Sequence, residues 1–230
     1  MSQTWFPYAA FLSLAFIIFF NVNALTIQKV GMIITSIFQK LSLIFPVLVG
    51  LVFFNEAGST AKYVAIPLTI VAIIMSNLRN KHDEEAMLTI KKYWYLPILV
   101  FAGSGLIEVM LFYVQHTGKV GSAGLNFTST LFFLAGVWGI IILTVIRQLK
   151  FTKNEIIAGI VLGIPNFFTI YLIIKGLDLG WDGSVLFPIN NIGVIFFTAI
   201  VGIIAFKEKL TKINYIGLLL AILAVYLISQ

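Results

Sequence analysis

Residues 122–146 read SAGLNFTSTLFFLAGVWGIIILTVI, a stretch of 25 positions without a charged side chain. An α-helix rises about 1.5 Å per residue, so about 20 apolar residues are enough to cross a hydrocarbon layer about 30 Å thick. Similar stretches recur along the whole chain, which is 60% hydrophobic, 10% charged and has a mean hydropathy of +1.04. Such a chain has too little polar surface for a water-soluble globule, and its composition indicates a protein embedded in a lipid bilayer.

The hydropathy pattern predicts eight membrane-spanning helices joined by short polar connections. The predicted spans are residues 8–26, 31–54, 62–79, 94–114, 122–146, 155–175, 184–206 and 213–229. Transmembrane β-strands would be segments of about 10 residues with alternating apolar and polar side chains, whereas these segments are continuously apolar. The predicted fold is therefore an all-α polytopic membrane protein. The first span has no basic leader and no small-residue cleavage pattern, so we expect it to be retained rather than removed as a signal peptide.

Basic residues are distributed unequally between the two sets of connections. One side holds 11 of them: Lys29, Arg79, Lys81, Lys91, Lys92, Arg147, Lys150, Lys153, Lys207, Lys209 and Lys212. The other side holds three, Lys62, Lys119 and Lys175. Loops rich in Lys and Arg stay in the cytoplasm, so the pattern predicts a multi-pass protein of the cytoplasmic (inner) membrane with its basic loops inside and both visible termini outside.

The chain also contains an internal repeat. A shift of 152 residues aligns the first three spans with the last three without a gap from about Tyr8 to Asn77. The coinciding residues include polar and glycine positions, which match by chance less readily than aliphatic ones: Gly31 with Gly183, Gly50 with Gly202, Phe54 with Phe206, Glu56 with Glu208, and Tyr63 with Tyr215. The general resemblance of any two apolar helices remains the alternative explanation.

The first predicted span corresponds to the sixth, so the repeat has a period of five helices. An odd period makes the two copies cross the membrane in opposite directions, which is an inverted-topology repeat. On this interpretation residues 1–79 form a first repeat truncated to three helices, residues 80–93 a cytoplasmic linker and residues 94–230 a complete second repeat of five. Two further helices are then expected before Met1.

Two segments resemble the EamA-type domain of the drug/metabolite transporter superfamily: FFNEAGSTAKY (Phe53 to Tyr63) and FKEKLTKINYIGLLLAILAVYLIS (Phe206 to Ser229). Each is similar to the Glu that follows the fourth helix of an EamA repeat and to the Gly-, Leu- and Ala-rich fifth helix. The resemblance implies two inverted repeats of five helices and the outward movement of amino acids, metabolites or drugs by alternating access. It also implies both termini inside, which departs from the charge distribution.

Two ionisable residues lie deep within predicted spans. Lys40 is about ten residues into the second span, and Glu108 is about fourteen residues into the fourth, which runs in the same direction. Their depths differ by about 6 Å at 1.5 Å per residue, which a lysine side chain nearly covers. A charge at the centre of a span costs about 2.5–3.5 kcal/mol on insertion scales, so we expect Lys40 and Glu108 to pair. The pair is either structural or part of a solute site, with Glu108 accepting a proton or an amine and Lys40 binding a carboxylate.

Amides add further candidates for a solute-binding site. Gln39 and Asn191 are equivalent under the 152-residue shift and would face each other across a pseudo-two-fold axis. Asn190, Asn166 and Asn126 are the other amides considered. Each could instead join two helices, a contact worth under about 2 kcal/mol. Pro46, Pro165 and Pro188 interrupt apolar spans, where they either kink the helix or free carbonyls toward a cavity.

Signatures of enzymes are absent from the sequence. There is no H-E-x-x-H, G-x-S-x-G or P-loop pattern, and no cysteine, so we expect no catalytic residues, no metal site and no cofactor. The expected partners are a small-molecule solute and the lipid bilayer, not nucleic acid. Gly159 and Gly163 form a G-x-x-x-G pattern that leaves a homodimer open. The sequence thus predicts a membrane transporter, the alternative being a truncated, non-transporting remnant or a helical scaffold that binds a partner.

Overall fold

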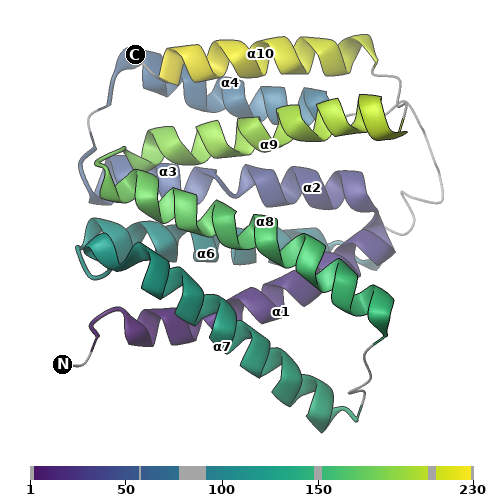
Figure 1. Cartoon of the computed structure of the whole chain (residues 1–230). Helices are drawn as coiled ribbons and strands as arrows, with labels where there is room; N and C mark the ends of the chain where they lie inside the picture. The colour runs from purple at the N-terminus through teal and green to yellow at the C-terminus, as the bar shows by residue number, and fades with distance from the viewer. Residues whose placement is uncertain (1–2, 57, 78–91, 148–151, 207–210, 229–230) are drawn as a thin grey trace. The chain divides into compact units, whose positions relative to one another are not determined.

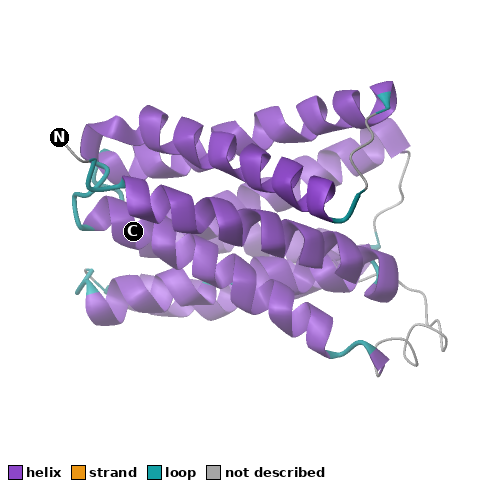
Figure 2. Cartoon of the chain, turned by 90° about the horizontal axis from the view of Figure 1, so that it is seen from below, coloured by secondary structure: helices purple, strands orange, loops and turns teal. Residues whose placement is uncertain are grey.

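A computed structural model describes residues 3–56, 58–77, 92–147, 152–206 and 211–228. Within these ranges the chain is helical, joined by short turns, and holds no strand (Figure 2). The predicted linker, residues 80–93, lies outside the described residues except for its last two positions. So do the basic residues from Arg79 to Lys91, together with Lys150, Lys207, Glu208 and Lys209.

The helices follow one another in the order of the predicted spans (Figure 1). Their bounds are α1 Phe6–Val30, α2 Met32–Leu41, α3 Ile44–Phe53, α4 Thr60–Asn77, α6 Tyr95–His116, the 3₁₀ turn η1 Gly121–Ala123, α7 Gly124–Val145, α8 Lys153–Asp178, α9 Gly183–Phe206 and α10 Lys212–Ile228. Most observed ends lie within two residues of the predicted ones, because polar and glycine residues end each apolar stretch. The second predicted span differs, since it is divided between α2 and α3.

Among the described residues, six segments are long and apolar enough to cross a membrane. They are Phe6–Val30, Ile34–Phe53, Tyr95–His116, Gly121–Val145, Lys153–Asp178 and Gly183–Val201. Thr60–Ser76 and Lys212–Leu227 are shorter apolar helices. Only 11% of the most apolar part of Lys153–Asp178 is buried inside the protein, so this helix presents Ile, Leu and Val outward. Extensive outward apolar surface fits lipid contact.

The helices group into two compact units, which are described separately. Unit 1 comprises Met1–Asn21 and Val109–Trp181, and unit 2 comprises Val22–Glu108 and Asp182–Gln230. Helices α1 and α6 pass from one unit into the other. These groups come from spatial proximity and differ from the sequence repeats, which remain a prediction.

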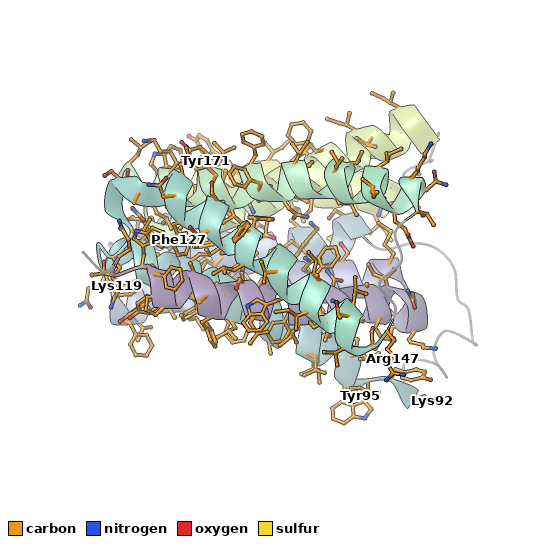
Figure 3. All side chains as sticks on the ribbon, turned by 60° about the horizontal axis from the view of Figure 1, so that its bottom comes forward. Lys92, Tyr95, Lys119, Phe127, Arg147 and Tyr171 are labelled. Carbon is orange, nitrogen blue, oxygen red and sulfur yellow. The ribbon has the colours of Figure 1, made fainter. Side chains whose placement is uncertain are left out.

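In unit 1, α7 packs against α8 through aromatic and small residues. The Phe132 and Phe167 rings lie 5.6 Å apart, and Gly124 allows Ile174 to approach the α7 backbone. The indole of Trp5 is 7% exposed and meets Phe127 edge to face; Figure 3 labels Phe127. The Trp5–Phe127 contact therefore holds the residue just before α1 against α7.

A polar contact joins α1 to the turn after α6 in unit 1. The Lys119 ammonium donates a hydrogen bond to the Tyr8 hydroxyl at 2.7 Å and lies 4.6 Å from the centre of the Tyr8 ring. This hydrogen bond holds the pKa of Lys119 above its ordinary value of 10.5.

Unit 2 is built from antiparallel helix pairs. The start of α10 lies at the end of α4, because the Asn214 amide donates to the carbonyls of Met75 and Ser76 at 3.1 and 3.0 Å (Figure 1). Gly217 lets the two backbones approach, since a Cβ there would collide with the backbone of Ser76. Helices α3 and α9 also pack together. Their contact includes the buried cluster Leu43, Val47, Ile73 and Ile195.

Candidate functional site

The second predicted span is interrupted at Ser42 and Leu43, between α2 and α3. Pro46, four residues after Ser42, has no N–H to donate to the Ser42 carbonyl, so the regular helical ladder cannot continue there. The tighter bonds Leu43 N–H to Lys40 O (3.3 Å) and Phe45 N–H to Ser42 O (3.0 Å) carry the chain through the break. Because of this interruption, polar groups lie inside a segment that hydropathy alone reads as one continuous helix.

Glu108 of α6 lies beside the break. The Ser42 hydroxyl is 3.1 Å from Glu108 Oε2 and 2.6 Å from the Gln39 carbonyl oxygen. The side-chain amide of Asn191, on α9, donates to the Phe187 carbonyl of its own helix at 3.1 Å and also lies near the Glu108 carboxyl. Three helical segments that are distant in sequence thus place hydroxyl, amide and carboxyl groups together within unit 2.

Burial isolates these groups from bulk water. The Ser42 side chain is fully buried and Asn191 is 6% exposed, while Glu108 is partly buried. A second contact holds α3 against α6, because Gly105, three residues before Glu108, leaves room for the Phe45 ring. Phe45 also packs against Phe101, with ring centres 4.7 Å apart. The carboxyl therefore has an apolar aromatic neighbourhood on the α3 side.

The predicted direct ion pair between Lys40 and Glu108 is wrong for the described residues. Lys40 lies close enough to influence Glu108 electrostatically, but no ion pair within 4.0 Å joins them. The Ser42 hydroxyl contacts the carboxyl instead, and the Asn191 amide lies near it. An acidic group with a nearby amine and uncharged donors can hold a proton or bind a ligand ammonium.

The remaining predicted site residues are placed differently. Gln39 has an exposed side chain, although it directly precedes Lys40. Asn190 is partly buried in unit 2. In unit 1, Asn126 is exposed, and Asn166 is partly buried and donates to the Leu162 carbonyl of its own helix at 3.1 Å. The described structure thus brings Glu108 and Asn191 together, with Lys40 nearby.

Ser42 was not among the predicted site residues, because a lone serine in an apolar span usually bonds to its own helix. Pro46 is the signal that could have indicated Ser42, because a proline leaves the carbonyl four residues earlier without its helical hydrogen bond.

Elsewhere, a small open pocket of about 50 Å³ in unit 1 is lined by Ser122, Tyr171, Lys175 and Asp178 among others, and by none of the predicted site residues. Figure 3 shows Tyr171 in this unit. Within the described ranges, no group of three or more His, Cys, Asp or Glu side chains could hold a metal ion.

The apolar helices and their outward-facing aliphatic surface define the class: a multi-pass helical membrane protein. No protein-family model matches the chain. An uncharacterized protein of Haemophilus influenzae (strain Rd KW20) is 28% identical over 210 residues, which cover 90% of this chain and 69% of that protein.

Proposed function

We propose that the protein is a transporter that moves a small metabolite, amino acid or drug across the cytoplasmic membrane by alternating access, as efflux or exchange. The observation that carries the proposal is the Glu108 carboxyl beside the interrupted α2–α3 segment. Ionisable groups within membrane spans are costly and are kept for function, and transporters place solute sites at discontinuous helices. Glu108 would accept a proton or a solute ammonium, with Ser42 and Asn191 orienting its carboxyl and Lys40 attracting an anionic group.

The arrangement of helices in unit 2 supports an inverted repeat of the EamA type. Helix α4 begins at Thr60 and α10 at Lys212, an offset of 152 residues, which equals the sequence repeat. Under the same offset α3 corresponds to the second half of α9. Helices α4 and α10 are antiparallel and packed together, and α3 packs antiparallel to α9. Pairing of equivalent, oppositely directed helices is expected around a pseudo-two-fold axis.

Eight membrane crossings remain part of the proposal. Helix α4 has 18 residues and α10 has 17, which correspond to about 27 and 26 Å at 1.5 Å per residue. Both lengths approach the thickness of about 30 Å that a span must cover. With eight crossings, the basic connections lie in the cytoplasm and Lys62, Lys119 and Lys175 lie outside.

Binding by the purified protein tests the proposal. Thermal-shift measurements against amino acids, nucleosides and cationic drugs should reveal a compound that stabilises the wild type saturably. We expect Glu108→Gln and Ser42→Ala to weaken this compound's binding at least about tenfold, which is about 1.4 kcal/mol. Lys40→Met should weaken binding of compounds that carry a carboxylate more than of those that do not.

Gln39→Ala is the matched control, because Gln39 adjoins Lys40 yet has an exposed side chain. It should bind as the wild type does. If no compound stabilises the folded wild type, or if Glu108→Gln binds normally, the proposed site is refuted and the alternative of a non-transporting scaffold gains support.

A further inference from the structure

One end of unit 2 is closed by three polar contacts made by residues from distant parts of the chain. Glu56, in the connection between α3 and α4, accepts hydrogen bonds from the backbone N–H groups of Gly183 and Ser184 at 2.6 and 2.9 Å. Beside it, the Lys62 ammonium forms an ion pair with Asp182 Oδ2 at 2.7 Å. Residues 182–184 are the start of α9, so both contacts tie the α3–α4 connection to this helix end.

The Glu56 contact is specific in its geometry. The first turn of α9 has N–H groups without helical partners and carries partial positive charge, so a carboxylate is well placed there. Gly50 provides the space, because a Cβ at this position would lie 2.6 Å from Glu56 Oε2. These three positions, Gly50, Glu56 and Gly183, are among those that coincide in the 152-residue repeat.

The opposite end of unit 2 is held differently. The residue 152 positions after Lys62 is Asn214, and the residue 152 positions before Asp182 is Val30, so the repeat cannot form the equivalent ion pair. Asn214 instead donates to carbonyls at the end of α4. The Gly31 N–H, equivalent to that of Gly183, donates to the backbone carbonyls of Thr26 and Ile27 in the preceding helix. The Lys62–Asp182 ion pair therefore occurs at one end of unit 2 and has no equivalent under the 152-residue repeat.

We infer that the Lys62–Asp182 ion pair and the Glu56 cap of α9 form a gate that closes this end of unit 2 and governs access to the Glu108 site. The inference rests on the proposed transport function. Asn191, which lies near Glu108, follows Ser184 by seven residues, about 10 Å further along α9. Movement of the α9 start away from Glu56 and Lys62 would open a route toward Asn191, and the unmatched ion pair makes the closed state of this end the favoured one.

Ser184 provides a direct probe of the gate. Its side chain is fully buried, and its hydroxyl has no hydrogen-bond partner in the described structure. The chain has no cysteine, so Ser184→Cys introduces a unique, nearly isosteric thiol. Its rate of reaction with a polar maleimide, measured in nanodiscs that leave both membrane faces accessible, reports how often the gate opens. No solute is needed.

We expect Asp182→Asn and Lys62→Met, each combined with Ser184→Cys, to speed the reaction at least about fivefold, which corresponds to about 1 kcal/mol. The charge exchange Lys62→Asp with Asp182→Lys should restore a slow reaction, and this restoration separates loss of the ion pair from general loss of structure. Lys175→Met is the matched control, because Lys175 is exposed and belongs to unit 1. It should leave the rate unchanged.

Unchanged rates in the two neutralised variants would overturn the inference, and so would a fast reaction in the charge-exchanged variant. A second test uses Lys62→Cys with Asp182→Cys, joined by a bifunctional thiol reagent. Cross-linking should stop solute uptake into proteoliposomes and leave solute binding intact, whereas continued uptake would show that this end need not open. Absence of solute binding in the wild type would refute transport itself, independently of the maleimide rates.

Discussion

At the scale of single residues, several glycines are required because a neighbouring side chain lies where their Cβ would be. The Glu56 carboxylate lies where a Cβ of residue 50 would be, and the Phe45 ring lies where a Cβ of residue 105 would be. Gly163 of α8 has nothing within 4 Å of the position of a Cβ. The sequence pattern G-x-x-x-G drew attention to Gly159 and Gly163, yet the glycines with close contacts lie elsewhere.

This difference predicts opposite effects of two glycine substitutions. Gly50→Ala should displace the Glu56 carboxylate and lower the free energy of unfolding by about 1–2 kcal/mol, the usual cost of losing a helix cap. Gly163→Ala should be neutral or stabilise by up to about 1 kcal/mol, because alanine favours the helix and meets no neighbour. Thermal unfolding in detergent measures both. A Gly50→Ala protein as stable as Gly163→Ala would contradict the close contact with Glu56.

The site shows which residue-level features the sequence could predict. Glu108 was predicted because a carboxyl deep in a span is rare, and Asn191 because it has an equivalent amide in the other repeat. Gln39 was predicted on the same ground, yet its side chain is exposed. Adjacent helical residues are turned by about 100°, so Gln39 and Lys40 cannot both face the same neighbour. A uniformly apolar helix has no polar face, so its hydropathy does not reveal which side chains turn toward the neighbouring helices.

At the scale of helices, the apolar stretches predicted the position and order of the helices, because hydropathy falls at the end of each helix. The break between α2 and α3 was not predicted, since the residues on both sides remain apolar and the span keeps its full length. Pro46 was noted as a kink or a source of free carbonyls, and the contact between Ser42 and Glu108 shows which polar group lies at the break.

Restoring the helix at the break should weaken the site. Pro46→Ala supplies an N–H for the Ser42 carbonyl, which favours a continuous helix and moves the Ser42 hydroxyl relative to Glu108. We expect solute binding to weaken about tenfold without loss of thermal stability. Titration of the purified variant with the stabilising compound measures the affinity. Pro165→Ala, in α8 of unit 1, is the control and should bind normally. Normal binding by Pro46→Ala would show that the break does not set the position of Ser42.

At the scale of the whole molecule, the unequal distribution of basic residues predicts the orientation of every helix. The two ends of α7 provide a matched pair, because Ser122 and Arg147 are both exposed and lie beyond opposite ends of one apolar helix. In intact cells, a membrane-impermeant maleimide should label Ser122→Cys and leave Arg147→Cys unlabelled until the membrane is opened. The reverse pattern would place the basic loops outside and both visible termini inside.

The composition of unit 2 has a consequence for biosynthesis. Its helices come from two stretches separated by residues 109–181, and α10, the partner of α4, follows the other described helices in the chain. During translation α4 therefore enters the bilayer without its packing neighbour, and the first turn of α9 is absent when Glu56 is already in place. A nonsense mutation before Lys212 would leave α4 permanently without its partner.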